Sequence, residues 1–288
     1  MPGENIGKRS TTELAIKCLL FTATVIPSIL AGSIFSSMGI MRWPEFLLMF
    51  AGMFIAQLAG DYLFYFFANS KSNQKTYPGW KPFFADGWLT GKGLLFAGLV
   101  CLAIDAIIGL YFVINSGWQV ALFAFAGGAL IALLTPVSFT GLREISAFLG
   151  FGPLAMSGMM LVMSGKMFVP EVVAASIPVG LWVAIVAHFK SAKVKEVDTK
   201  KGTILMTTNK TIVVSMAMLA YLTLVVGVTL GYLPILGLLG LVSIIPMFVA
   251  IHAMFFKTST ETSYIKSVTM SIVALVVGGL LMATAYLL

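Results

Sequence analysis

Residues 267–288 read SVTMSIVALVVGGLLMATAYLL, a continuous run without any Asp, Glu, Lys or Arg. An α-helix needs about 20 apolar residues to cross the hydrocarbon core of a bilayer, which is about 30 Å thick. The run meets that requirement, so the sequence predicts a transmembrane helix here. A strand of a membrane barrel would instead alternate polar and apolar residues over about ten positions.

The same apolar character extends along the whole chain. Of its 288 residues, 59% are hydrophobic and 10% are charged, and the mean hydropathy is +1.00. Soluble domains carry about 25% charged residues. A soluble core cannot bury this much apolar surface, so the composition excludes a water-soluble globular enzyme, a disordered chain, collagen and a coiled coil. We expect one all-α transmembrane domain over residues 1–288.

Nine segments of the chain are long and apolar enough to span a bilayer as helices. The fifth is the shortest and is rich in Gly and Met, so its limits are the least sharply defined. The nine predicted spans are 18–39, 46–69, 93–115, 118–137, 147–164, 168–189, 211–230, 233–256 and 267–288.

The distribution of positive charge predicts the orientation in the membrane. If the N-terminus is cytoplasmic, every Lys and Arg except Arg42 and Lys166 falls on the inner side. Cytoplasmic loops of membrane proteins carry this excess of positive charge. We therefore expect a multi-pass protein of the cell membrane, with a cytoplasmic N-terminus and an external C-terminus.

Charge and cysteine content limit the partners. The formal net charge of +7 is explained by orientation and lipid contact, and no soluble basic domain is present that would bind nucleic acid. Cys18 and Cys101 both lie in apolar runs, which predicts neither a disulfide framework nor a metal cluster. The glycine pairs Gly152/Gly158 and Gly227/Gly231 are interpreted as sites of close helix packing.

Two acidic residues lie inside predicted spans, where a carboxylate is costly unless it meets a cation or a polar cavity. Asp61 shares a helix face with Gln57, because the two are four residues apart. We interpret Asp61 as a ligand of a metal ion or a substrate, and a paired carboxylate inside the bundle is the alternative. Asp105, in the third span, either takes part in proton or ion binding or is a neutral hydrogen-bonding acid.

The remaining titratable residues give weaker signals. Glu144 and Glu171 suit the N-terminal turns of helices, where the helix dipole favours negative charge. His188 closes the sixth span, where it can contact an anion, and His252 is expected to hydrogen-bond within the bundle. Glu196 and Asp198 lie in a Lys-rich loop, which is either a solvated loop or a metal site that faces Asp61.

Three short patches resemble the UbiA superfamily of intramembrane prenyltransferases, and most closely its MenA-type branch of dihydroxynaphthoate prenyltransferases. Residues 57–64 read QLAGDYLF, and that branch has Asn-Leu-x-Asn-Asp-Tyr-x-Asp, so Leu, Asp and Tyr match while both asparagines and the last aspartate differ. Residues 141–144 (GLRE) and 151–154 (FGPL) resemble its Gly-Leu-Gly-Glu segment and the Phe-Gly-Pro-Leu that follows. Residues 198–202 (DTKKG) match the end of its second acidic motif.

The resemblance implies a nine-helix bundle that transfers an isoprenyl chain from an isoprenyl diphosphate to an aromatic quinone precursor, as in menaquinone biosynthesis. It also implies Mg²⁺ at the diphosphate, because a departing diphosphate needs concentrated positive charge. Lys190, Lys193 and Lys195, in the loop after the sixth predicted span, could replace part of that charge by direct contacts to phosphate oxygens. By this resemblance Asp61 and Asp198 are the catalytic residues and, with Glu196, the metal ligands. The substrate-binding residues are Gln57, Tyr62, Arg143, Glu144, His188, Lys190 and Lys193.

Two other functions fit the same sequence. The acidic motifs have fewer carboxylates than the family pattern. They are therefore compatible with a non-catalytic relative that binds an isoprenoid lipid or a membrane partner. A small transporter that uses Asp105 is the other possibility. Donor length, acceptor identity and oligomeric state do not follow from the sequence.

Overall fold

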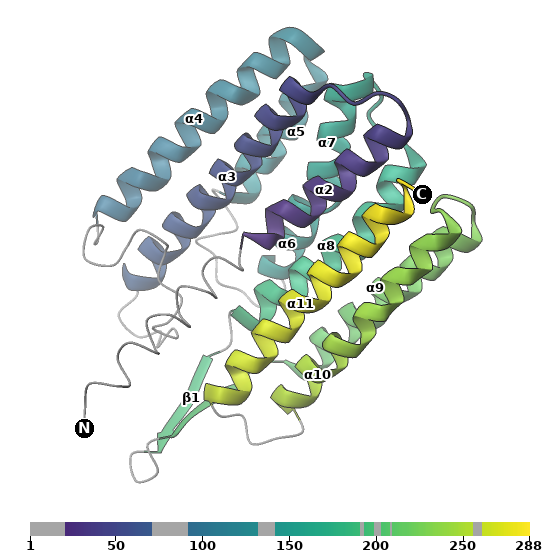
Figure 1. Cartoon of the computed structure of the whole chain (residues 1–288). Helices are drawn as coiled ribbons and strands as arrows, with labels where there is room; N and C mark the ends of the chain where they lie inside the picture. The colour runs from purple at the N-terminus through teal and green to yellow at the C-terminus, as the bar shows by residue number, and fades with distance from the viewer. Residues whose placement is uncertain are drawn as a thin grey trace, which may run out of the picture.

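The computed structural model describes residues 21–70, 92–131, 142–190, 193–198, 203–207, 209–255 and 261–288. Within these ranges the chain is a bundle of apolar helices with one short β-hairpin (Figure 1). The helices are α2 (Thr22–Ser37), α3 (Trp43–Ser70), α4 (Lys92–Ser116), α5 (Gln119–Ala129), α6 (Leu142–Phe151), α7 (Pro153–Ser164), α8 (Pro170–Lys190), α9 (Lys210–Thr229), the 3₁₀ helix η3 (Ile235–Ser243), α10 (Ile244–Phe255) and α11 (Glu261–Ala285).

The described helices confirm an all-α polytopic membrane protein. Seven helical segments have the length and apolar composition to cross a bilayer, and the apolar helices α2 and α5 are shorter. Each coincides with one of the nine predicted spans. Residues 18–20 of the first predicted span and residues 132–137 of the fourth lie outside the described residues. Large apolar side chains such as Phe96, Ile107 and Phe125 are exposed on the bundle, as lipid contact requires.

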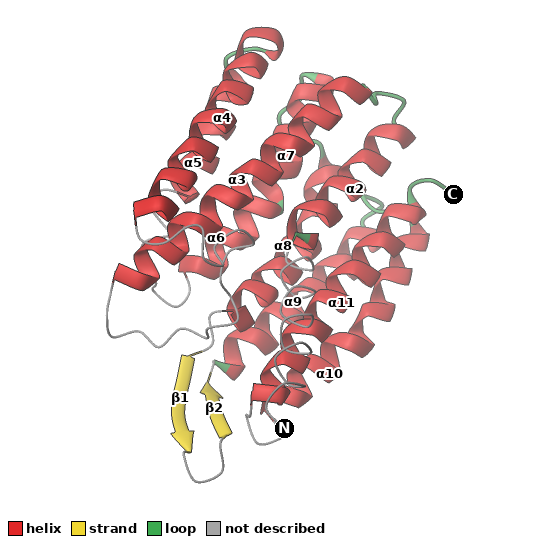
Figure 2. Cartoon of the chain, turned by 60° about the vertical axis from the view of Figure 1, so that its left-hand side comes forward, coloured by secondary structure: helices red, strands yellow, loops and turns green. Residues whose placement is uncertain are grey.

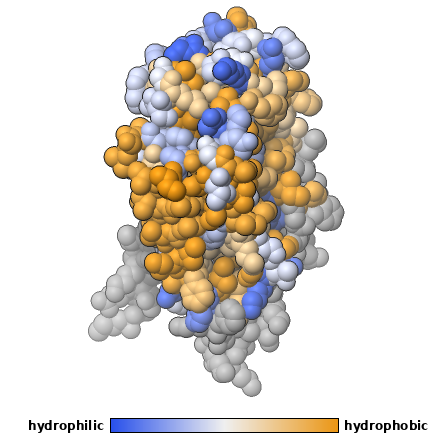
Figure 3. All heavy atoms as spheres, turned by 90° about the vertical axis from the view of Figure 1, so that its right-hand side faces the viewer, coloured by the Kyte–Doolittle hydropathy of each residue, from blue (hydrophilic) through white to orange (hydrophobic). Residues whose placement is uncertain are grey.

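The apolar surface forms a band on the molecule. Figure 3 shows orange hydrophobic residues across the middle and lower part of one face, with hydrophilic residues gathered at its two ends. A band of this kind matches a hydrocarbon layer bounded by two polar interfaces.

The centre of the bundle is α8, which packs against α2, α6, α7, α9 and α11. Its side chains are mostly buried, including Trp182, Ile185 and Phe189. The helices α4 and α9 lie at opposite sides of the bundle (Figure 1). The α4 helix packs mainly on α3 and α5.

The fifth predicted span is longer than expected and is broken in the middle. Helices α6 and α7 together cover residues 142–164, so the helix begins five positions before the predicted boundary. The break falls at Gly152, directly before Pro153, whose ring removes a backbone N–H and favours the first turn of a new helix. A Cβ on Gly152 would lie 2.7 Å from the Ser176 carbonyl oxygen, so glycine is needed where this break touches α8.

The glycine predictions are confirmed at three positions and wrong at one. A Cβ on Gly227 would lie 2.8 Å from Leu233, and a Cβ on Gly158 would lie 3.3 Å from Phe123, so both glycines permit close packing. Gly231 has no neighbour within 4 Å of a built Cβ, and its φ is +75°. Its role is therefore the left-handed turn after α9, which glycine adopts without strain.

The charged connection after α8 contains the hairpin formed by β1 (Lys193–Asp198) and β2 (Thr203–Thr207). The strands pair antiparallel, with Lys193 opposite Thr207 and Asp198 opposite Thr203. The hairpin extends beyond the end of the bundle at which α8 ends (Figure 2). The sequence predicts only a polar loop in this region.

Candidate functional site

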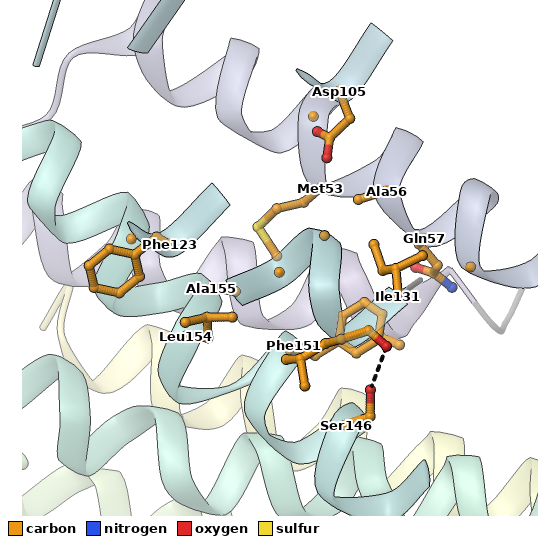
Figure 4. A pocket seen from close by; sticks show the side chains of 18 of the residues that line it. Met53, Ala56, Gln57, Asp105, Phe123, Ile131, Ser146, Phe151, Leu154 and Ala155 are labelled. Carbon is orange, nitrogen blue, oxygen red and sulfur yellow. Dashed lines mark hydrogen bonds between the residues drawn. The ribbon is translucent and has the colours of Figure 1, made fainter. Parts of the chain in front are cut away.

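A cavity of about 360 Å³ lies between helices α2 to α8. Most of its wall is apolar, including Met53, Phe123, Phe151 and Leu154 (Figure 4). The wall residues of α3 recur every three or four positions from Met49 to Phe64, which is one face of that helix. The cavity lies beside Asp61, and most of its lining residues come from the first to the sixth of the predicted spans.

Glycines open much of this space. Those that line it include Gly60 on α3, Gly128 on α5 and Gly150 on α6. A Cβ built on Gly128 meets no atom within 4 Å, and the nearest atoms to those on Gly60 and Gly150 lie at 3.9 Å. These glycines face the cavity, so a side chain at any of them would reduce its volume.

The polar side chains of the wall are few and unevenly placed. They are Gln57, Asp61, Asp105, Arg143, Ser146 and Lys190. Asp61, Arg143 and Lys190 gather where α6 begins and α8 ends, and we call this region the polar end of the cavity. Asp105 lies farther along, in the middle of α4.

The polar end is organised by an ion pair between α8 and α3. Lys190 Nζ donates to Asp61 Oδ1 at 2.7 Å, and the two side chains are 10% and 25% exposed. The Tyr264 hydroxyl of α11 donates to the Lys190 backbone carbonyl at 3.5 Å, at the geometric limit of a hydrogen bond. Asp61 is therefore a cavity residue and a paired carboxylate. The alternative interpretation of a paired carboxylate inside the bundle is confirmed, and the interpretation of Asp61 as a ligand stays a prediction.

A second cation lies beside this pair. The Arg143 guanidinium carbon is 4.3 Å from the ring centroid of Phe64, in a cation–π arrangement. Phe64 is three residues after Asp61, on the same face of α3. Both Arg143 and Phe64 line the cavity.

Next to the polar end, a buried pair joins α6 to α8. His188 Nδ1 lies 2.6 Å from Glu144 Oε1, with side chains that are 3% and 5% exposed. The backbone N–H of Asn209 donates to His188 Nε2 at 3.3 Å, so Nε2 acts as an acceptor and Nδ1–H donates to Glu144. Glu144 lies in the first turn of α6, as predicted, but faces a histidine rather than water. Neither residue is part of the cavity wall.

The other predicted site residues lie in three places. Gln57 lines the cavity, and its side-chain oxygen accepts a hydrogen bond from the Thr24 hydroxyl of α2. Tyr62 is buried against α4, near Gly98, and is not a wall residue. Lys193, Glu196 and Asp198 belong to β1, and their side chains lie outside what the structure describes.

The described residues do not make up a magnesium site. Mg²⁺ requires several oxygen ligands in octahedral geometry. Asp61 supplies one carboxylate, and that carboxylate is already paired with an ammonium group. Within the described ranges no three His, Cys, Asp or Glu side chains are grouped so as to hold a metal ion.

Sequence reasoning missed several contacts of this region. Thr24, Phe64 and Asn209 gave no signal of their own, although Phe64 follows Asp61 at helical spacing. Their roles depend on how helices distant in sequence meet.

The fold and this cavity define the protein as a polytopic α-helical membrane protein with an internal cavity that is apolar along most of its length and charged at one end. Searches with the sequence find no matching protein-family model and no matching curated protein.

Proposed function

We propose that this protein is a divergent relative of the UbiA superfamily that binds an isoprenyl diphosphate in its cavity and transfers the isoprenyl chain to an aromatic acceptor. The observation that carries the proposal is the pairing of Lys190 with Asp61, beside Arg143, at the only strongly charged part of the described cavity wall. The ligand that fits has an anionic head and a long apolar chain.

The head is bound by charge. Lys190 and Arg143 provide two cations at the polar end, and both groups form strong hydrogen bonds to phosphate oxygens. Asp61 holds Lys190 toward the cavity and is the carboxylate nearest to the reacting carbon of a bound donor. An anion at this position replaces Asp61 as one of the partners of Lys190.

The chain is bound by the apolar wall. Beyond the polar end, the cavity is lined by aliphatic, aromatic and glycine residues of α5 and α7, such as Gly128, Leu154 and Gly158. Burial of apolar area contributes about 25 cal/mol per Å², so an isoprenyl chain gains affinity along the whole wall.

The reaction follows from this arrangement. The bond between the allylic carbon and the diphosphate oxygen breaks, and its electron pair leaves with the diphosphate, whose growing charge Lys190 and Arg143 stabilise. The aromatic rings of Phe64 and Phe151 stabilise the allylic cation. A ring carbon of the acceptor supplies the electron pair of the new bond, and its proton passes to a base, for which Asp61 is the nearest carboxylate.

The orientation belongs to the same proposal. The polar end lies on the side that carries nearly all Lys and Arg, so an isoprenyl diphosphate reaches it from the cytoplasm. We therefore propose that the protein lies in the cell membrane, with a cytoplasmic N-terminus and an external C-terminus.

A second candidate function rests on the ion pair itself. Because Asp61 is already neutralised by Lys190, the site is also suited to hold an isoprenoid lipid without reaction. In this case the protein is a non-catalytic relative of the UbiA superfamily, which binds the isoprenyl diphosphate and releases it unchanged.

The test measures binding and turnover in lipid nanodiscs. Binding of farnesyl diphosphate and of farnesol is compared for the wild type, Lys190→Ala and the control Lys166→Ala, an exposed lysine beyond α7. We expect Lys190→Ala to weaken diphosphate binding by about 10-fold to 100-fold, the effect of one charged hydrogen bond, and to leave farnesol binding unchanged. Lys166→Ala should bind both like the wild type.

Turnover then separates the two candidate functions. Labelled farnesyl and geranylgeranyl diphosphate are incubated with dihydroxynaphthoate, with and without Mg²⁺, and prenylated product is measured. Product formation supports the transferase, whereas diphosphate binding without product supports the silent relative. Absence of diphosphate binding in the wild type rejects both.

A further inference from the structure

Asp105 is a polar residue of the cavity wall that the proposed reaction does not use. It lies about 20 Å from the start of α4 and about 16 Å from its end, at 1.5 Å rise per residue, and is therefore near the middle of the bilayer. Its side chain lines the cavity, as do those of Met53 and Ile108. Figure 4 shows its carboxyl group pointing from α4 toward Met53.

A glycine on the facing helix makes room for this carboxyl group. A Cβ built on Gly52 would lie 3.2 Å from Asp105 Oδ1 and 3.4 Å from Ile108 Cγ2. The first distance is shorter than most van der Waals contacts and the second is an ordinary one, so the carboxyl group packs against the α3 backbone at Gly52. The glycine thus fixes where the carboxyl oxygens lie along the cavity.

Within the described part of the chain, Asp105 has no hydrogen bond or ion pair. A carboxyl group at this depth is costly unless it meets a polar partner. The described helices around it supply none, and its oxygens face the cavity. Its partner is therefore expected to be a group of the bound ligand.

The position of Asp105 indicates which ligand this is. Gly52 and Asp61 are nine residues apart on α3, so Asp105 lies about 13 Å along the cavity from the polar end. That interval matches a diphosphate followed by an aromatic ring with an oxygen on its far side. The apolar chain of the donor has the α5 and α7 side of the cavity available to it.

We propose that Asp105 binds the far oxygen of the aromatic acceptor and so selects acceptors that carry two ring oxygens. This inference rests on the proposed function, because it places an acceptor beside the donor. A neutral carboxyl group both donates and accepts a hydrogen bond, which suits a phenolic hydroxyl or a quinone carbonyl among apolar walls. Met53 offers a favourable thioether contact to the ring.

The experiment compares two probes in nanodiscs, naphthohydroquinone and naphthol, which differ by one ring oxygen. The wild type should bind naphthohydroquinone about 10-fold more tightly, as one buried hydrogen bond allows. Asp105→Leu should reduce this ratio to about one, while Asp105→Asn, which keeps a donor and an acceptor, should retain most of it. Gly52→Ala should lower the ratio with Asp105 still present, because the added methyl group displaces the carboxyl group.

Farnesyl diphosphate binding is measured in the same variants and should not change, because Asp105 is far from the polar end. This readout separates the two proposals. If the wild type fails to bind the diphosphate, the proposed function fails while the ratio still reports on Asp105. The acceptor role is rejected if Asp105→Leu keeps the wild-type ratio of the affinities for naphthohydroquinone and naphthol. It is also rejected if the wild type binds neither probe.

Two further outcomes are decisive. If a hydrophobic amine or Na⁺ binds the wild type and is lost in Asp105→Leu while the probe ratio is unchanged, Asp105 is a cation site and the proposal is overturned. If Asp105→Leu does not fold, as judged by thermal unfolding, Asp105→Asn and Gly52→Ala decide. The proposal then requires a lowered ratio in Gly52→Ala and a retained one in Asp105→Asn.

Discussion

Lys190 Nζ lies 2.7 Å from Asp61 Oδ1 and joins two helices whose contacting residues are 129 positions apart in the chain. The contact joins the end of α8, the sixth predicted span, to α3, the second predicted span. It also puts a cation and a carboxylate at the same end of an apolar cavity. In the proposed reaction Lys190 stabilises the departing diphosphate, and Asp61 holds Lys190 toward the cavity.

Asp61→Asn should abolish turnover while donor binding stays equal to that of the wild type or becomes tighter. The amide no longer holds the Lys190 ammonium by charge, so Lys190 is more available to a diphosphate. No carboxylate then remains at the polar end of the described cavity wall to take the proton of the acceptor. Equilibrium binding of farnesyl diphosphate and single-turnover product formation measure the two effects separately. Wild-type turnover in Asp61→Asn would refute the assigned role.

Gly128→Ala should weaken isoprenyl diphosphate binding and at the same time stabilise the fold. A methyl group there enters the cavity without a clash, and alanine in a helix is favoured over glycine by about 0.5–1 kcal/mol. Gly128→Leu should weaken binding further because it fills more of the space. Thermal unfolding and ligand titration of the same preparations check both parts.

Gly278→Ala is the matched control for these cavity variants. A Cβ on Gly278 would lie 2.6 Å from Trp182 Cη2 in the core, so overpacking should destabilise the protein by about 1–3 kcal/mol. Ligand affinity of the folded fraction should stay unchanged. If Gly278→Ala and Gly128→Ala had the same effects, the distinction between packing glycines and cavity glycines would be lost.

Glu144→Ala should destabilise the bundle by about 3–5 kcal/mol, because it removes one partner of a buried pair and leaves His188 without its acceptor. The double variant Glu144→Ala/His188→Ala should cost less than the sum of Glu144→Ala and His188→Ala, since each single change leaves the other member of the pair without this partner. Unfolding in detergent measures all three. Additive effects would mean that the two side chains do not interact in the folded protein.

Cysteine labelling in intact cells tests the orientation. In a background with Cys18 and Cys101 replaced by serine, Lys166→Cys should react with an impermeant thiol reagent added outside, and Lys210→Cys should react only after the cells are opened. Both positions are exposed in the structure. The reverse pattern would turn the polar end of the cavity toward the exterior and remove its access to cytoplasmic diphosphates.

The spans were predictable because lipid imposes a simple requirement on composition. Residues 267–288, for example, contain no Asp, Glu, Lys or Arg, and α11 occupies most of them. The break between α6 and α7 was not predicted, although Gly152 and Pro153 stand side by side. A glycine–proline pair marks a helix start only when the neighbouring helix comes close, and that contact is made by residues of α8.

The site was predictable in depth but not in its contacts. Hydropathy indicates how far Asp61 lies from a membrane surface, and helical spacing indicates that it shares a face with Gln57. Neither shows which helix faces that side. The partner Lys190 therefore emerged only from the packing of α8 on its neighbours, and Arg143 over Phe64 is a contact of the same kind.

Asp105 illustrates the same limit. The sequence indicates that a carboxyl group in the middle of this apolar span costs free energy unless it has a polar partner. It does not show whether that partner belongs to a neighbouring helix or to a ligand. The structure gives it Gly52, which supplies space and no polar group. Only the structure shows that the residue facing Asp105 is a glycine, which cannot hydrogen-bond to it through a side chain. Asp105 is therefore a residue of the cavity wall rather than one side of a hydrogen bond between helices.

The most direct test of the account is the position of a bound isoprenyl diphosphate, mapped with a farnesyl diphosphate analogue that carries a photoreactive group at the end of its chain. After irradiation in nanodiscs, mass spectrometry identifies the labelled residues, with unlabelled farnesyl diphosphate as competitor. The account predicts labels on cavity residues of α5 and α7, such as Phe123, Leu154 and Met159, which the competitor removes and Lys190→Ala reduces. Labels confined to lipid-facing residues such as Phe96 and Ile107, unaffected by the competitor, would contradict it.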